Sequence, residues 1–220
     1  MTENKMKAPR TFRIVVASIL LLSILAQWLF LKYGSTNNAQ YMDDGISATI
    51  LPIASPITSF HLNDHNGNTF TQDNLIGKWS IFSFGYTHCP DICPTTLNIL
   101  NQVDKKLREM ENPILPQTIF ITLDPERDDV ATLAGFVPWF NKNFIGLTGT
   151  IEQIHALTKN LGIMSQKRRD EGAEEDNYQI DHTVTIMLID DKGQLRALSS
   201  APHKAQTITD DFIKITEKYN

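Results

Sequence analysis

The chain has 220 residues, of which 41% are hydrophobic and 20% are charged, and its formal net charge is −5. This length is typical of one domain, and the composition is too apolar for a disordered chain. The negative charge argues against nucleic acid as a partner, because phosphate binding needs a basic face. With only two cysteines, a disulfide-rich scaffold and a zinc site of four thiolates are both excluded.

The apolar residues gather near the N-terminus. Residues 14–31 (IVVASILLLSILAQWLFL) are eighteen residues without a charge, and as a helix they would span about 27 Å, the thickness of a bilayer core. We predict a cytoplasmic basic tail over residues 1–13, a single transmembrane anchor over 14–31 and an exported remainder, because basic flanks stay in the cytoplasm. A cleaved signal peptide is the alternative, but its apolar stretch would be shorter, and residues 28–30 offer no small-residue cleavage site.

The net charge divides unevenly along the chain. Residues 1–33 contain five Lys or Arg and one Glu, hence +4, and the remainder contains fifteen Lys or Arg and twenty-four Asp or Glu, hence −9. The part predicted to be exported is therefore distinctly acidic, which favours solubility and a basic partner but does not specify a fold.

The pattern after the anchor predicts a polar tether over residues 32–58 and one α/β domain over residues 59–220. A turn at Asn66-Gly67 predicts a hairpin. Short apolar runs predict strands at residues 79–84, 117–123, 183–189 and 194–198. Apolar side chains at steps of three and four predict helices over residues 97–110, 130–140, 151–161 and 208–219, the second kinked or shortened by Pro138. A charge run at residues 170–176 predicts a solvated loop. This order of elements is typical of a thioredoxin-like fold with helical crossovers.

Both cysteines lie between a predicted strand and a predicted helix, in the segment GYTHCPDICP of residues 85–94. Backbone amides and the helix dipole at such a place stabilise a thiolate. Three residues separate Cys89 from Cys93, so the two sulfur atoms lie within reach of each other. The pair is interpreted in three ways: as a structural disulfide, which would close an inefficiently small ring, as a redox-active dithiol, or as part of a metal site.

His182 is a third candidate ligand, although a lone histidine is more often a surface residue. It stands directly before the strand predicted at residues 183–189, whose start approaches the cysteine loop in a thioredoxin-like sheet. Thioredoxin-like oxidoreductases place a cis-proline there, whereas this chain has no proline between Pro138 and Pro202. Two thiolates and one imidazole are fewer ligands than the four that structural zinc normally takes, but they suit Cu(I). Cu(II) could bind the same three ligands and add a water molecule.

At this point the sequence resembles the Sco family, named for synthesis of cytochrome c oxidase. The resemblance runs from about residue 60 to residue 219 and is carried by GYTHCPDICPTTL (85–97), LDPERD (123–128), GLTGTIEQI (146–154) and YQIDHTV (178–184). It implies a thioredoxin-like fold in which Cys89, Cys93 and His182 are the copper ligands. Asp129-Val130 departs from the Thr-Pro pair that often follows the second motif, which matters for the start of a helix more than for the metal.

The same resemblance implies a task. It describes a membrane-anchored copper chaperone that binds one ion, as Cu(I) or Cu(II), and delivers it to the binuclear copper site of cytochrome c oxidase subunit II. The implied location is the bacterial cytoplasmic membrane, with the domain facing the periplasm or the cell exterior, and a copper donor protein and a thiol reductant are further expected partners. Two alternatives stay open: a thiol–disulfide reductase that acts through Cys89 and Cys93 on the cysteines of that site, and a copper or redox signalling module. Whether the chain is an enzyme stays open with them.

Other polar residues receive structural expectations. We expect His88 to be exposed or to support Cys89, Asp91 and Asp181 to cap turns or orient site groups, and Asp124, Glu126 and Arg127 to form a capped helix start with a local ion pair. The remaining histidines are expected at the surface: His61, His65, His155 and His203.

Overall fold

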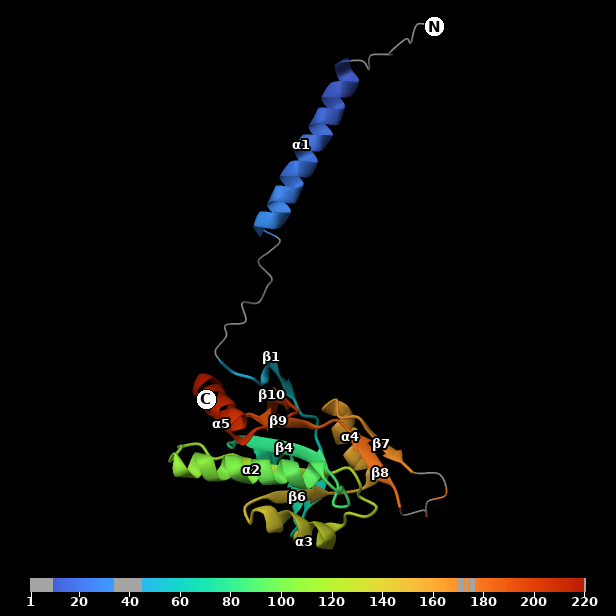
Figure 1. Ribbon diagram of the computed structural model, residues 1–220, viewed down its shortest axis with the longest axis vertical. Helices are drawn as coiled ribbons and strands as arrows, with labels where there is room; N and C mark the ends of the chain where they lie inside the picture. The colour runs from blue at the N-terminus through green and yellow to red at the C-terminus, as the bar shows by residue number, and fades with distance from the viewer. Residues whose placement is uncertain (1–9, 34–44, 170–171, 173, 175–176, 220) are drawn as a thin grey trace. The chain divides into compact units, whose positions relative to one another are not determined.

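The computed structural model describes residues 10–33, 45–169, 172, 174 and 177–219 (Figure 1). The chain divides into two compact units, residues 1–44 and residues 45–220. Most of the predicted basic tail, the tether between residues 34 and 44, and most of the charge run at residues 170–176 lie outside the described residues.

The first unit contains one helix, α1 (Arg10–Tyr33), which includes the uncharged segment at residues 14–31. Several of its large apolar side chains are exposed, among them Ile19, Leu21 and Trp28. Among the described residues, no helix has the length and hydropathy expected of a membrane span. The anchor over residues 14–31 stays a prediction.

The second unit is built on a mixed sheet of eight strands in the order β1-β10-β9-β4-β5-β6-β2-β3. Strands β4, β5 and β6 run parallel, and the other pairs are antiparallel. The strands are β1 (Thr49–Pro56), β2 (His61–Asp64), β3 (Thr69–Thr71), β4 (Ser80–Gly85), β5 (Gln117–Thr122), β6 (Ile145–Thr148), β9 (Thr185–Ile189) and β10 (Gln194–Ser200). A separate antiparallel pair is formed by β7 (Ser165–Arg168) and β8 (Gln179–His182).

Helices cover both faces of the eight-stranded sheet. The helices are α2 (Ile92–Glu109), α3 (Val130–Phe140), α4 (Ile151–Asn160) and α5 (Ala205–Tyr219). Successive side chains of β4 point to opposite faces, as in any strand. Ile81 therefore packs in the cluster that holds the apolar faces of α2, α3 and α5, and Phe82 packs in the cluster that holds α4.

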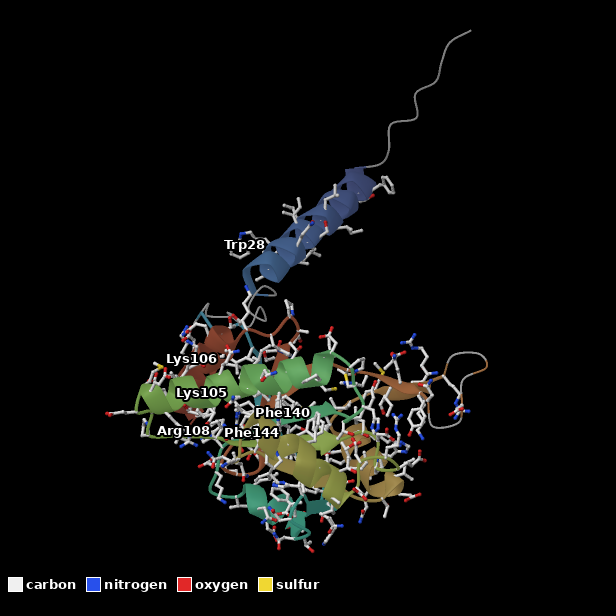
Figure 2. All side chains as sticks on the ribbon, turned by 60° about the horizontal axis from the view of Figure 1, so that its bottom comes forward. Trp28, Lys105, Lys106, Arg108, Phe140 and Phe144 are labelled. Atoms are coloured by element: carbon white, nitrogen blue, oxygen red, sulfur yellow. The ribbon has the colours of Figure 1, made fainter. Side chains whose placement is uncertain are left out.

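The helix that follows the cysteine loop, α2, is amphipathic. Its buried side chains recur at steps of three and four, as the sequence predicts: Leu97, Leu100, Val103 and Leu107. Lys105 and Arg108 lie on the exposed side, where Figure 2 shows them along the helix. Burial of this stripe fixes the direction of α2, and with it the position of the cysteine loop at its start.

Most predicted elements are confirmed, and the differences have physical causes. The hairpin, the four strands and the four helices are present, and α3 includes Pro138 and ends two residues later. The prediction of a tether over residues 32–58 is wrong at Thr49–Pro56, which forms the edge strand β1. This strand contains two prolines and mostly exposed side chains, so its sequence lacks the pattern of a strand. Strand β6 is short, and β7 and β8 are polar, so the sequence contains no apolar run that predicts these three strands.

Candidate metal centre

The cysteine loop connects the end of β4 with the first turn of α2. Cys89 lies in the loop and is half-buried, whereas Cys93 is the second residue of α2 and is 2% exposed. The backbone N–H of Cys93 donates a hydrogen bond to Cys89 Sγ over 3.4 Å. Both cysteines are free thiols. The helix start thus brings the two sulfur atoms together, as the spacing predicts.

Gly85, at the end of β4, makes room for Cys93. A Cβ atom at this position would lie 2.6 Å from Cys93 Sγ and 2.9 Å from Cε2 of Phe120. Both distances are shorter than ordinary carbon contacts, so only glycine fits without displacement of the sulfur. The motif therefore begins with glycine because the Cys93 side chain packs directly against the strand backbone.

The two thiols differ strongly in acidity. A hydrogen bond from the Cys93 side chain lowers the pKa of Cys89 to about 5, against the opposing effect of burial, and backbone N–H groups assist. The same hydrogen bond, together with burial, raises the pKa of Cys93. Cys89 is therefore the thiolate at neutral pH, and Cys93 is its proton-bearing partner.

His182, the last residue of β8, lies beside the buried cysteine. Its Nε2 atom is 3.7 Å from Cys93 Sγ, and its Nδ1 atom is 3.0 Å from the carbonyl oxygen of Thr183. A carbonyl only accepts, so Nδ1–H donates to it and the lone pair of the neutral ring is at Nε2, toward the sulfur. The ring also makes an edge contact with Tyr86, with centroids 6.4 Å apart.

The separation of Cys93 Sγ from His182 Nε2 fits a shared ion. With metal–sulfur and metal–nitrogen bonds of zinc-type length, two ligand atoms on one ion lie roughly 3.6–3.8 Å apart at tetrahedral to trigonal angles. Within the described part of the chain, no three His, Cys, Asp or Glu side chains are already arranged around one ion position. The structure therefore contains two of the predicted ligands at a suitable separation, and Cys89 on the adjacent turn.

His182 and Asp181 lie between two hollows. One, of about 240 Å³, is lined by Tyr86, Cys89 and Ile92. The other is a larger groove of about 1140 Å³, lined by residues of α4, β7 and the segment between them, which include His155 and Met164. Both hollows are lined by Asp181 and His182. The imidazole is thus accessible from two sides of the β7–β8 pair.

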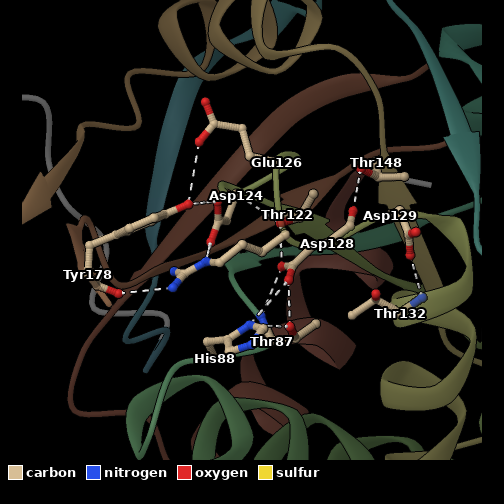
Figure 3. A network of polar contacts seen from close by, with 11 residues as sticks. Thr87, His88, Thr122, Asp124, Glu126, Asp128, Asp129, Thr132, Thr148 and Tyr178 are labelled. Carbon is tan, nitrogen blue, oxygen red and sulfur yellow. Dashed lines mark hydrogen bonds and ion pairs between the residues drawn. The ribbon is translucent and has the colours of Figure 1, made fainter. Parts of the chain in front are cut away.

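Behind the cysteine loop, the buried carboxylate of Asp128 holds the chain in place (Figure 3). It accepts hydrogen bonds from the Thr87 backbone N–H at 2.9 Å, from Thr87 Oγ1 at 2.5 Å and from Thr122 Oγ1 at 2.6 Å. Burial raises the pKa of Asp128. The His88 side chain is 57% exposed, with Nδ1 4.0 Å from the same carboxylate, so the expectation of an exposed or supporting histidine is confirmed.

Arg127 forms the expected ion pair with Asp124, with Nε 2.5 Å from Oδ2. The predicted helix cap is wrong in detail, because Asp129 caps α3 and accepts a hydrogen bond from the Thr132 backbone N–H at 2.7 Å. Tyr178 was not expected from the sequence to support the site, but its hydroxyl donates to Asp124 Oδ1 over 2.7 Å. Its signal was its place as the first residue of the YQIDHTV motif.

The other expectations are met in part. Asp91 stands at the start of α2 without a capping hydrogen bond from its side chain, and Asp181 pairs with Arg168 at 3.1 Å. His61 and His155 are exposed as expected. His65 and His203 are partly buried, which corrects the expectation: His65 Nδ1 accepts from the Gly146 N–H at 3.0 Å.

Comparison with known proteins gives consistent results. The family described as SCO1/SenC matches residues 53–217. The mitochondrial SCO2 homolog of Mus musculus is 38% identical over 154 residues, which cover 70% of this chain and 59% of that protein. A SCO2-like protein of Rickettsia felis is 40% identical over 136 residues, or 61% of this chain and 64% of that protein. The chain thus spans less than two thirds of the length of these relatives.

Solved structures share the α/β fold of the second unit. The crystal structure of Arabidopsis thaliana ScoI with copper bound has a TM-score of 0.69 and 32% identity, and the match covers 74% of this chain and 98% of that one. The crystal structure of yeast Sco1 with copper bound also has a TM-score of 0.69 and 32% identity, with 76% of this chain and 91% of that one covered. The thioredoxin-like arrangement expected from the order of elements is confirmed by these likenesses.

Proposed function

Because this chain belongs to the SCO1/SenC family, we propose that it carries a copper ion as cargo for the assembly of cytochrome c oxidase. The observation that carries the proposal is the 3.7 Å separation of Cys93 Sγ from His182 Nε2, beside a second thiol of lowered pKa. Relatives whose structures are described as holding copper share the fold. Soft thiolate ligands favour Cu(I) over the hard cations.

In this proposal Cys89, Cys93 and His182 are the three ligands. Cys89 already approaches the first turn of α2, and rotation of its half-buried side chain brings its sulfur to the ion. The ion replaces the proton of Cys93, because a bound metal holds a thiol in its thiolate form. Three ligands leave one coordination position of the copper ion open. A ligand of the acceptor binds at this position, and the acceptor's ligands then replace the two cysteines and the histidine one at a time.

We propose the binuclear copper site of oxidase subunit II as the acceptor. The support is the family resemblance of the motifs and the accessible position of His182 between two hollows. An approaching ligand from either hollow reaches the imidazole before it reaches Cys93, which is 2% exposed. Cys89 also lines one of the two hollows, so His182 and Cys89 are open to exchange first, and the buried Cys93 is the last ligand to be released.

The test is copper binding by the full-length protein, reduced and kept in detergent, against a chelator that competes for Cu(I). We expect one ion per chain, and a large loss of affinity in Cys93→Ser and in His182→Ala. His155→Ala removes an exposed histidine of the neighbouring groove and serves as the matched control. Stoichiometric binding that survives both Cys93→Ser and His182→Ala would contradict the ligand assignment.

A second function, reduction of a partner's disulfide, is favoured by the unequal acidity of the two thiols. The Cys89 thiolate would attack a disulfide of the acceptor, form a mixed disulfide and release one acceptor thiolate. Cys93 would then lose its proton and attack the Cys89 sulfur, so that the bond to the acceptor breaks and the second acceptor thiolate leaves. Two electrons pass to the partner, which gains two thiols, and Cys89 and Cys93 end as a disulfide. This reaction needs both cysteines but not the imidazole. Full activity of His182→Ala in oxidase assembly would favour the reductase over the copper carrier.

We propose further that residues 14–31 anchor the protein in the bacterial cytoplasmic membrane. The support is the eighteen-residue run without a charge and the basic residues before it. Anchoring would raise the effective concentration of the domain near a membrane-bound acceptor. Resistance of the full chain to extraction by alkaline carbonate is the expected result, and release into the supernatant would contradict it.

A further inference from the structure

The proposed ligands come from two separate parts of the second unit. The cysteines follow β4 of the eight-stranded sheet, whereas His182 ends β8, which pairs with β7 in a separate two-stranded sheet. The separation of thiol from imidazole therefore depends on how the β7–β8 pair is fastened to the main sheet. A displacement of about 1 Å in a functional site can cause a large loss of function. The contacts that hold the β7–β8 pair in place therefore control the geometry of the proposed ligands.

Arg127 makes one of these fastening contacts through its guanidinium group. Its Nε donates to Asp124 within the turn after β5, and its Nη1 donates to the carbonyl oxygen of Tyr178 over 3.2 Å. Tyr178 stands one residue before β8 and four residues before His182. The fixed fork of the guanidinium thus joins the β5–α3 turn to the strand that carries the imidazole.

Two aromatic rings lie against the same guanidinium. Arg127 Cζ is 3.6 Å from the centroid of the Tyr178 ring and 5.8 Å from that of Tyr86. Tyr86 is 2% exposed and contacts the His182 ring edge-on. Arg127 therefore contacts two groups that hold His182: Tyr178, which precedes its strand, and Tyr86, whose ring packs against the imidazole.

A neighbouring contact is weaker. Lys167 of β7 forms an ion pair with Glu126, and its Nζ lies 4.7 Å from the Tyr178 ring centroid. Both members of this ion pair are largely exposed, so solvent screens it. The Arg127 side chain is 15% exposed and its partner Asp124 is buried, which makes this the less screened pair.

We propose that Arg127 is a positioning residue that, through Tyr86 and Tyr178, fixes His182 against the cysteine loop. The expected effect of Arg127 on copper binding rests on the proposed function. The contacts of Arg127 with Tyr86 and Tyr178 are present in the protein without metal. A lysine cannot replace the arginine, because an ammonium group has neither the planar face nor the fork that spans Asp124 and the Tyr178 carbonyl.

The test compares Arg127→Lys with a matched control, Arg196→Lys, in the full-length protein. Arg196 is also paired with a buried carboxylate, Asp190, at 2.9 Å, is 13% exposed, and lies over a tyrosine ring at 4.5 Å. It lies in β10 and contacts Asp190 and, in α5, the ring of Tyr219, none of which is a residue of the cysteine loop or of β8. We expect Arg127→Lys to weaken copper binding about 10-fold to 100-fold, the range for residues that orient metal ligands, and Arg196→Lys to leave it unchanged.

The double variant shows whether the effect passes through the imidazole. In the His182→Ala background, Arg127→Lys should cause no further loss of copper affinity, because no imidazole remains to be positioned. A second measurement uses the protein without copper: the ring carbon–proton resonance of His182 should shift or broaden in Arg127→Lys, and stay unchanged in Arg196→Lys.

The outcomes separate this inference from the proposed function. If His182→Ala binds copper as tightly as the wild type, the ligand assignment fails, and the ring resonance still decides the role of Arg127. If His182→Ala weakens binding but Arg127→Lys does not, or if Arg127→Lys weakens binding equally with and without His182, the positioning role is overturned. Tyr178→Phe keeps the ring but loses the hydroxyl bond to Asp124, so we expect it to shift the resonance less than Arg127→Lys does.

Discussion

At the scale of single residues, the chemistry of the candidate centre depends on how differently the two thiols are placed. Cys89 is half-buried and receives hydrogen bonds, whereas Cys93 is buried and donates one. The spacing of the cysteines predicts their proximity, but it does not predict which one ionises. That order depends on the first turn of α2, which the sequence pattern alone does not describe.

The pKa of Cys89, about 5, gives the first prediction. Alkylation of the reduced chain by iodoacetamide should occur at Cys89 and be near its full rate at pH 6.5, because the thiolate is already formed there. Mass spectrometry of the labelled peptide identifies the site. Cys93→Ala removes the donor and should slow the reaction at pH 6.5. A rate that rises until pH 8–9, as for an ordinary thiol of pKa about 8.5, would contradict the prediction.

Gly85 gives a second prediction at this scale. Gly85→Ala should displace Cys93 Sγ, because the new Cβ would lie 2.6 Å from it, and should lower the free energy of unfolding by about 1–3 kcal/mol through overpacking. Urea denaturation measures the loss. Gly135→Ala is the control, since nothing lies within 4 Å of a Cβ placed there in α3; it should raise stability by about 0.5–1 kcal/mol. Equal effects of the two variants would refute the packing argument.

At the scale of elements, sequence reasoning succeeds where burial is one-sided or complete. Strands β4 and β5 are apolar runs, and α2 and α5 have apolar stripes, so all four are predictable. Strand β8 (QIDH) has one buried side chain in four, and its pairing with β7 is decided by contacts such as Arg127 with Tyr178, 51 residues apart. Its residues were recognised through a motif, but its strand was not.

Helix α4 offers a prediction about local signals. Thr150 Oγ1 accepts from the Gln153 N–H at 3.3 Å, and Gln153 Oε1 accepts from the Thr150 N–H at 2.8 Å, a reciprocal capping box. Thr150→Ala should lower the free energy of unfolding by about 1 kcal/mol, measured by urea denaturation. Thr150→Ser keeps the hydroxyl and should restore most of the stability. Equal losses in both variants would show that the methyl group, not the cap, matters.

At the scale of the whole molecule, His203 couples folding to pH. Neither of its ring nitrogens has a hydrogen-bond partner among the described residues, and burial lowers its pKa below the usual 6.5. The unfolded chain therefore takes up a proton at a higher pH than the folded chain does. The stability associated with the neutral ring is complete above about pH 6.5 and is lost as the pH falls below that value.

The corresponding measurement is the unfolding midpoint Tm between pH 8 and pH 5. His203→Leu removes the titrating group without breaking a hydrogen bond, so its Tm should fall less over this range than that of the wild type. His61→Gln, at an exposed position, should follow the wild type. If Tm falls equally with pH in the wild type and in His203→Leu, His203 does not contribute to the pH dependence of stability.

The way the chain enters the second unit has a mechanical consequence. The backbone N–H groups of Ser47 and Ala48 both donate to the Asp211 carboxylate at 2.8 Å, and Lys214 Nζ donates to the Gly45 carbonyl at 2.7 Å. Strand β1 follows directly, at the edge of the sheet, with β10 and β9 between it and β4. A pull on the chain before residue 45 is borne first by α5 and then by the seam between β1 and β10. The loop with both thiols follows β4, in the interior of the sheet, so such a pull would detach an edge strand before it disturbed the candidate metal centre.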